Sequence, residues 1–183
     1  MLWQVVERAD QGWVGQAYQA LQDHYRSTGQ TERLREVRAR HDRHEADVAK
    51  GQLERSRLEA GDTFLHHGLT CEQLEPLRRV LSARSDCGAA WLVRKKLLYF
   101  PDRPLFVLCV RGKYRGWSVG RADRERTLVR QLVPAVELPG SVLVIAPVDQ
   151  FRRLARKVMA LADTEDLCAD RLEITSSTQS NES

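Results

Sequence analysis

The sequence predicts a mixed α/β protein, in which an N-terminal helical hairpin arm precedes a small three-stranded sheet sandwich. Two observations predict this class. Apolar residues recur at helical spacing in residues 12–28 and again, more sparsely, in residues 32–59. From residue 70, segments with helical spacing alternate with short apolar runs typical of buried strands, in the order α-β-β-α-β-α. The predicted parts are residues 1–60 (arm), 61–165 (α/β sandwich) and 166–183 (a disordered, acidic, Ser/Thr-rich tail).

The arm is predicted from two adjacent helical patterns. Residues 12–28 place Trp13, Ala17, Leu21 and Tyr25 on one face, and Gly29 ends the pattern. The second helix is polar on most sides, with a thin apolar stripe. A lone pair of such helices is marginal in water, so we expect the arm to dock on the rest of the chain or on a second copy.

The arm resembles part of a tetratricopeptide array. Leu21, Tyr25 and Gly29 match the first helix of that repeat, whereas Arg38 stands where the second helix usually has an aromatic residue. Because each repeat buries its face only against neighbours, the resemblance implies either the end of a larger array or an arm docked on the rest of the chain.

The sandwich begins with a connector, residues 60–68, and a capping box formed by Thr70 and Gln73, which predicts a helix to about Arg84. Strands are expected at residues 89–100 and 105–110, with the turn PDRP between them. Their closeness predicts antiparallel pairing.

The second half of the sandwich is a predicted helix, strand and helix. Asp123 is expected to cap a helix that reaches about Glu137, with Pro134 loosening its last turn. The apolar run at residues 141–147 is then a third strand, parallel to a neighbour because a helix separates them. Asp149 is expected to cap the final helix.

Charge is distributed unevenly along the chain, which carries a net charge of +4. Residues 61–162 contain eighteen basic and nine acidic residues, and residues 163–183 contain one basic and six acidic residues. No apolar run has the length of a membrane span, and no signal peptide is recognisable. We therefore predict a cytoplasmic protein, held at the inner membrane only through a larger protein or a partner.

The segment HDRHEADVAK, residues 41–50, is the candidate metal site. His41, His44 and Asp47 lie on one helix, but Val48 stands where a zincin helix would have its second histidine. We favour a solvated helix face. A hydrolase that adds His66 or His67 to these ligands is the alternative.

Two basic stretches, VRKK and RGKYRGW, are candidates for nucleic-acid binding, because cations contact phosphates and aromatic rings stack on bases. Lysine and arginine also protect strand edges from aggregation, and we favour that interpretation. The candidate residues are Lys95, Lys96, Lys113, Tyr114, Arg115 and Trp117.

The sequence lacks GxSxG, phosphate-loop and GxGxxG motifs. We therefore expect no catalytic residue and no cofactor. The predicted function is protein interaction, with a protein partner or a second copy bound through the arm.

Two stretches, HGLTCEQLEPLRRVL and AAWLVRKKLLYFPDRPLFVLCV, give the chain a family resemblance. They resemble the cytosolic C-terminal accessory region of bacterial membrane zinc metallopeptidases of the CAAX-protease-like type. The likeness covers roughly residues 13–160 and is most specific from Trp91 to Val110. It implies tetratricopeptide-like helices, a small α/β domain and a regulatory or protein-binding role. No catalytic residue carries over, because the zinc-binding helix and the membrane spans are missing.

Overall fold

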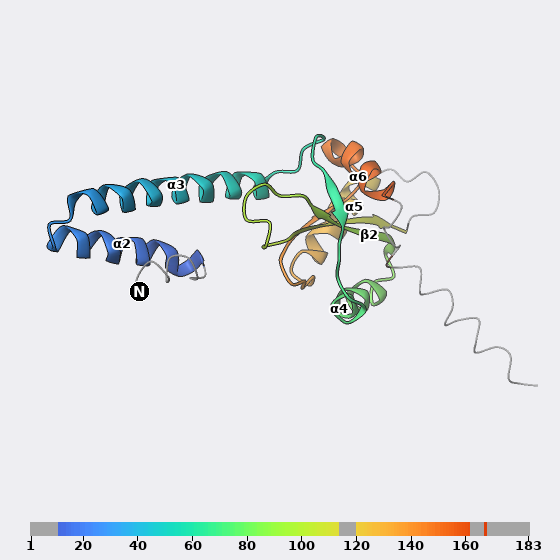
Figure 1. Cartoon of the computed structure of the whole chain (residues 1–183). Coiled ribbons are helices and arrows are strands. Elements are labelled where there is room, and N and C mark those ends of the chain that lie inside the picture. The colour runs from blue at the N-terminus through green and yellow to red at the C-terminus, as the bar shows by residue number, and fades with distance from the viewer. Residues whose placement is uncertain (1–10, 114–119, 162–166, 168–183) are drawn as a thin grey trace, which may run out of the picture. The chain divides into compact units, whose positions relative to one another are not determined.

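The computed structural model describes residues 11–113, 120–161 and Leu167. The chain divides into two compact units, Met1–Glu54 and Arg55–Ser183, where the sequence pattern places the boundary at residue 60. The predicted class is confirmed: helices and a mixed sheet are combined, and a helical hairpin comes first (Figure 1). None of the helices in the described ranges is both long and apolar enough to cross a membrane.

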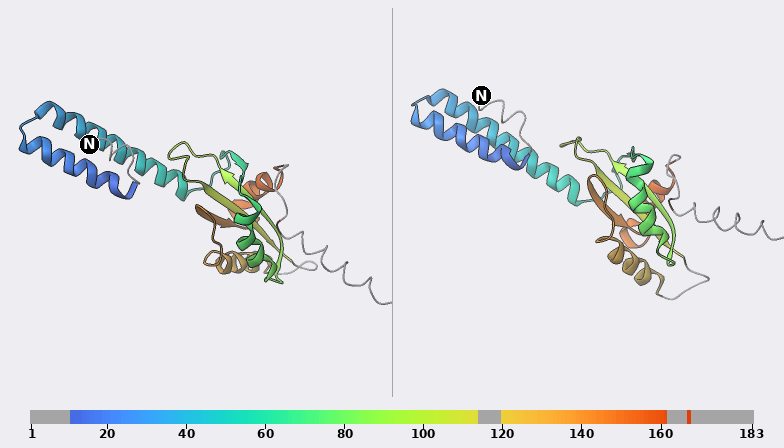
Figure 2. Two further views of the ribbon diagram at one scale, coloured as in Figure 1. Left: turned by 60° about the horizontal axis from the view of Figure 1, so that its bottom comes forward. Right: turned by 90° about the horizontal axis from the view of Figure 1, so that it is seen from below.

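The first unit is a hairpin of α2 (Gln11–Ser27) and α3 (Thr31–Ser56), which run side by side (Figure 2). Gly29, at φ 69°, ends α2 in the left-handed conformation. Its N–H donates to Arg26 O, and the next N–H donates to Tyr25 O, so carbonyls at the helix end are satisfied.

The hairpin has a small apolar core. Trp13 was expected on the buried face but is 65% exposed, because Val14 and Tyr18 turn inward in its place. The core consists of Val14, Tyr18, Leu21 and Tyr25 from α2, and Leu34 and Val37 from α3.

The second unit contains a sheet of four strands rather than the predicted three, in the order β1-β2-β3-β4. The additional strand is β1 (Phe64–His66), inside the predicted connector. With three residues it is too short for an alternating pattern, and pairing with the end of β2 defines it. The other strands are β2 (Cys87–Lys95), β3 (Leu105–Gly112) and β4 (Ser141–Ile145).

Strand pairing follows the prediction from chain order. β2 pairs antiparallel with β3, and β4 pairs parallel with β3 after a helical crossover. However, β2 ends at Lys95, five residues earlier than expected. The following loop is held by Arg55, whose guanidinium donates to the carbonyls of Tyr99, Phe100 and Arg103 at 3.1, 2.8 and 2.7 Å.

Helices cover both faces of the sheet. The expected capping box opens α4 (Cys71–Ser82). α5 (Arg121–Leu132) is shorter than predicted, because its regular turns stop two residues before Pro134, and Gly120 rather than Asp123 occupies its N-cap position. A 3₁₀ turn, η1 (Asp149–Phe151), leads into α6 (Arg152–Met159).

Two cores fill the sandwich, one on each face of the sheet. α4 and α5 contribute Leu77 and Leu128 to the first, and α6 contributes Val158 to the second. Leu167, which lies in the predicted tail, is buried in the first core and donates its N–H to Ala90 O at 3.0 Å. The rest of the predicted tail lies outside the described residues.

Candidate functional site

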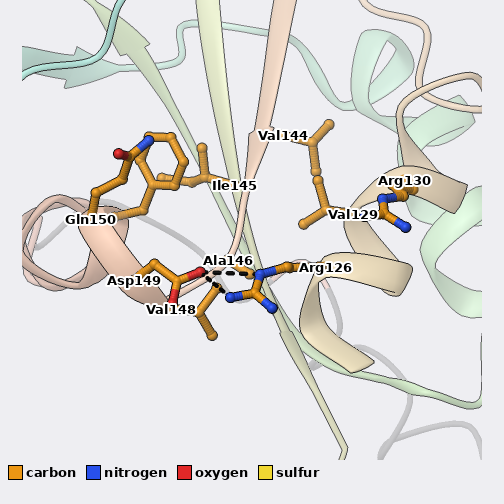
Figure 3. Close-up of a pocket in the computed structure, with 10 residues that line it drawn as sticks. Arg126, Val129, Arg130, Val144, Ile145, Ala146, Val148, Asp149 and Gln150 are labelled. Carbon is orange, nitrogen blue, oxygen red and sulfur yellow. Dashed lines mark hydrogen bonds and ion pairs between the residues drawn. The ribbon is translucent and has the colours of Figure 1, made fainter. Parts of the chain in front are cut away.

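A pocket of about 450 Å³ lies at the carboxyl end of β4 (Figure 3). Its location follows from the order of the elements. β3 and β4 are parallel, α5 packs on one face of the sheet, and η1 begins four residues after β4 ends. Ligand sites of α/β sheets commonly form beyond the carboxyl ends of such strands. The lining residues are Arg126, Val129, Arg130, Val144, Ile145, Ala146, Val148, Asp149, Gln150 and Phe151.

One wall of the pocket is an ion pair between α5 and η1. Arg126 donates from Nε and Nη2 to the same oxygen of Asp149, at 3.1 and 2.7 Å, and from Nη1 to Asp123 at 2.6 Å. The hydrogen bond with Asp149 is the main reason that the pKa of Arg126 is raised. Asp149 has φ 49°, an unfavourable conformation for a non-glycine residue, and its ion pair helps to hold it there.

The remaining lining combines an apolar floor with polar groups at the rim. Val129 and Val144 face one another in Figure 3. Both pack against the core beneath α4 and α5, whereas Phe151 packs against the core beneath α6. Arg130 is exposed, one helical turn beyond Arg126, and within the described residues its guanidinium takes part in no ion pair. Such a pocket can hold an apolar side chain and present a cation to a neighbouring anion.

The predicted metal ligands of the arm contact other side chains through ring stacking, hydrogen bonds and ion pairs. His41 stacks on Tyr18 with ring centroids 5.0 Å apart, and its two nitrogens lie 3.2 Å from Gln22 Nε2 and 3.5 Å from Glu45 Oε1. The ring of His44 also lies near the ring of Tyr18, with centroids 6.0 Å apart.

Asp47, the third predicted ligand, is 3.9 Å from Lys50 Nζ. Across the described ranges, no group of three or more histidine, cysteine, aspartate or glutamate residues could hold a metal ion. His41 and His44 are both half-buried.

The second histidine pair shapes a turn. The rings of His66 and His67 are 4.2 Å apart. Nδ1 of His66 accepts from Gly68 N at 3.1 Å, and Nδ1 of His67 accepts from Leu69 N at 2.9 Å. These bonds satisfy backbone donors between β1 and α4, which is a structural role.

The structure does not gather the predicted basic residues. Lys95 is buried, with its ammonium 2.9 Å from Asp62 Oδ2 and 2.9 Å from Arg57 O. Lys96 follows one end of β2, and Lys113 lies beside the other, next to the Cys87–Gly112 pair. Because β2 spans roughly 26 Å between these ends, the two exposed lysines are far apart. Tyr114, Arg115 and Trp117 lie outside the described residues.

Sequence reasoning missed the pocket residues. Arg126 and Arg130 lie on a helix judged only by its apolar positions, and Asp149 was expected to be a helix cap. The predicted strand–helix–parallel strand order was the available signal, because it places polar side chains at the carboxyl end of the last strand.

Compared with protein-family models, curated proteins and solved structures, the chain shows no match. The geometry of the pocket therefore carries the functional argument.

Proposed function

We propose that this chain is a non-catalytic protein-interaction module that binds a partner protein in the pocket at the carboxyl end of β4. The observation that carries the proposal is the combination of an apolar floor, formed by Val129 and Val144, with the rim cation Arg130. An apolar side chain of the partner fills the floor, and an adjacent carboxylate accepts from Arg130. The lining residues include no histidine, cysteine, serine or lysine, so this pocket offers no nucleophile–base pair.

The affinity that one apolar side chain and one carboxylate could gain in this pocket has an upper limit. Burying a leucine-sized side chain stabilises a complex by roughly 1.5–3 kcal/mol, and a hydrogen bond to a charged group contributes about 1.5–3 kcal/mol. Together these correspond to a dissociation constant of tens of micromolar at best, even before the costs of association. A partner must therefore make further contacts around the pocket.

The resemblance over residues 13–160 supports a more specific setting for this module. We propose that it acts as an accessory region of a bacterial membrane metallopeptidase-like protein, recruiting protein substrates or regulators. Nucleic-acid binding was the alternative from sequence. No arrangement of Lys95, Lys96 and Lys113 favours it, because one is buried and the other two lie at opposite ends of β2.

A peptide-library selection on the full chain tests the proposal. Enriched peptides should contain a large apolar residue close to an aspartate or glutamate. Arg130→Glu should weaken their binding by at least ~10-fold, or about 1.4 kcal/mol, because an attraction becomes a repulsion. Arg153→Glu is the matched control: Arg153 is exposed on α6 and does not line the pocket. Equal losses in both variants, or no enrichment, would reject the pocket as the binding site.

A further inference from the structure

Among the described strands, β4 is the last of the sheet and pairs with β3 alone. Within the described residues, the hydrogen bonds of β4 go to β3, and Ser141 N also donates to Pro104 O at 3.2 Å. The opposite edge of β4 therefore presents a row of backbone donors and acceptors. Such an edge is a template for pairing with another extended segment.

β4 also lacks the features that usually protect an edge. Its sequence, SVLVI, contains no charge and no proline, and its register with β3 is regular from Ser141 to Ile145. The three residues between Ser141 and Ile145 are only half-buried. By contrast, β1 at the other edge has only three residues, and short edge strands resist pairing.

The pocket lies at the carboxyl end of this edge strand. Val129 and Val144 pack against the core beneath α4 and α5, whereas Ile145 and Phe151 belong to the core beneath α6. One pocket thus draws its lining from both faces of the sheet. Because the lining residues lie at and just after the carboxyl end of β4, the pocket reaches both faces beyond the end of this strand.

We propose that β4 accepts an extended, acidic segment of a partner protein as a fifth strand of the sheet. The segment's backbone pairs with the free edge, one side chain fills the space over Val129 and Val144, and a carboxylate on the same face accepts from Arg130. This inference rests on the proposed function and specifies how the partner binds.

Two features identify the partner as an acidic polypeptide. Residues 61–162 carry eighteen basic and nine acidic residues, and Arg130 at the pocket rim pairs with no carboxylate among the described residues. Only a polypeptide offers donors and acceptors at the repeat of a strand, whereas a nucleic acid offers phosphates and bases. Strand addition also supplies the backbone contacts that the pocket alone lacks.

Calorimetric titration of the full chain tests the binding mode. The probe is a short synthetic peptide, acetylated and amidated, with valine at even positions and alternating glutamate and valine at odd positions. Two further peptides carry N-methyl groups on either the even or the odd amides. In an added strand only one set of amides faces β4, so one methylated peptide should lose at least ~10-fold in affinity, since each lost hydrogen bond costs about 1 kcal/mol. The other should bind nearly as well as the parent.

The outcomes separate the two proposals. If both methylated peptides bind like the parent and Arg130→Glu still weakens binding, the pocket functions but strand addition is wrong. Equal loss for both peptides also contradicts strand addition. Absence of all peptide binding contradicts both proposals.

Other occupants of the edge are tested on the same protein. Sedimentation that shows a dimer dissociated by the peptide would identify a second copy as the partner. Binding of the parent peptide that strengthens at least tenfold after removal of residues 168–183 would identify the chain's own acidic segment. A single-stranded oligonucleotide that binds where the peptide does not would assign the surface to nucleic acid. Each of these results would overturn an external acidic segment as the occupant.

Discussion

Glu125 is a fully buried carboxylate between α5 and the end of β3. Its Oε2 accepts from Gly112 N at 3.1 Å. Oε1 lies 3.9 Å from Arg121 Nε and has no hydrogen-bond partner in the part of the chain that the structure describes. Burial is the largest cause of the raised pKa of Glu125, against the lowering effect of the Gly112 hydrogen bond and the nearby arginines. The pKa of the Cys109 thiol is raised to about 12, mainly by burial and secondly by the charge of Glu125.

The raised pKa of Glu125 predicts a pH-dependent loss of stability. The folded chain holds the proton more tightly than the unfolded chain, so this group stabilises the fold below its unfolded pKa. That contribution is lost as the pH rises through its folded pKa. Glu125→Gln keeps an acceptor for Gly112 N and removes the charge.

The glutamine variant should therefore be more stable than the wild-type chain at pH 7–8 and gain nothing near pH 4. Urea unfolding at both pH values measures the difference. An equal effect of the substitution at the two pH values would contradict the raised pKa.

At the scale of elements, Lys95 and Asp62 join β2 to the segment before β1. Both side chains are largely buried, at 4% and 15% exposure, and their charged atoms are 2.9 Å apart. Lys157 also donates to the backbone carbonyl of Asp62, so the contact includes α6. Sequence reasoning assigned Lys95 to a basic surface because its partner lies thirty-three positions earlier in the chain. Long-range pairing of this kind leaves no local signal.

Removal of one partner should destabilise the sandwich. Asp62→Ala removes the carboxylate that pairs with the buried ammonium of Lys95, and we expect a loss of about 3 kcal/mol in the free energy of unfolding. Asp102→Ala, on an exposed turn, should change it by less than about 0.5 kcal/mol. Urea unfolding of both variants measures this. Similar values for the two substitutions would show that the Lys95–Asp62 pair contributes little.

The elements predicted best from the sequence are those whose patterns depend on residues close together in the chain. The capping box at Thr70 and the apolar run of β3 depend on neighbouring residues, and both were found. β1, the early end of β2 and the pocket depend on contacts between distant segments, such as Phe64 with Lys95 or Arg126 with Asp149. Hydrophobic periodicity reports only on residues close in the sequence, so it does not predict contacts between distant segments.

At the scale of the whole molecule, the described cores do not cross the unit boundary. The residues of the hairpin core lie between Val14 and Val37, and those of the two sandwich cores lie between Leu58 and Leu167. Residues 55–183 alone should therefore unfold cooperatively, within a few degrees of the full chain. Residues 1–54 alone should be largely unfolded, because a hairpin with so small a core is marginal.

Circular dichroism melts of the two fragments check this prediction. A cooperative melt of residues 1–54, or none for residues 55–183, would show that stability is distributed differently between the units.

The central claim is that a protein partner binds at the carboxyl end of β4. Its most direct test is a two-dimensional amide NMR titration of the full chain with the alternating valine–glutamate peptide. We expect the largest shifts at Val129, Val144 and Phe151, with slower hydrogen exchange along β4. Shifts confined to α2 and α3 would contradict the claim and place the binding site on the arm. Absence of saturable shifts would show that the peptide does not bind.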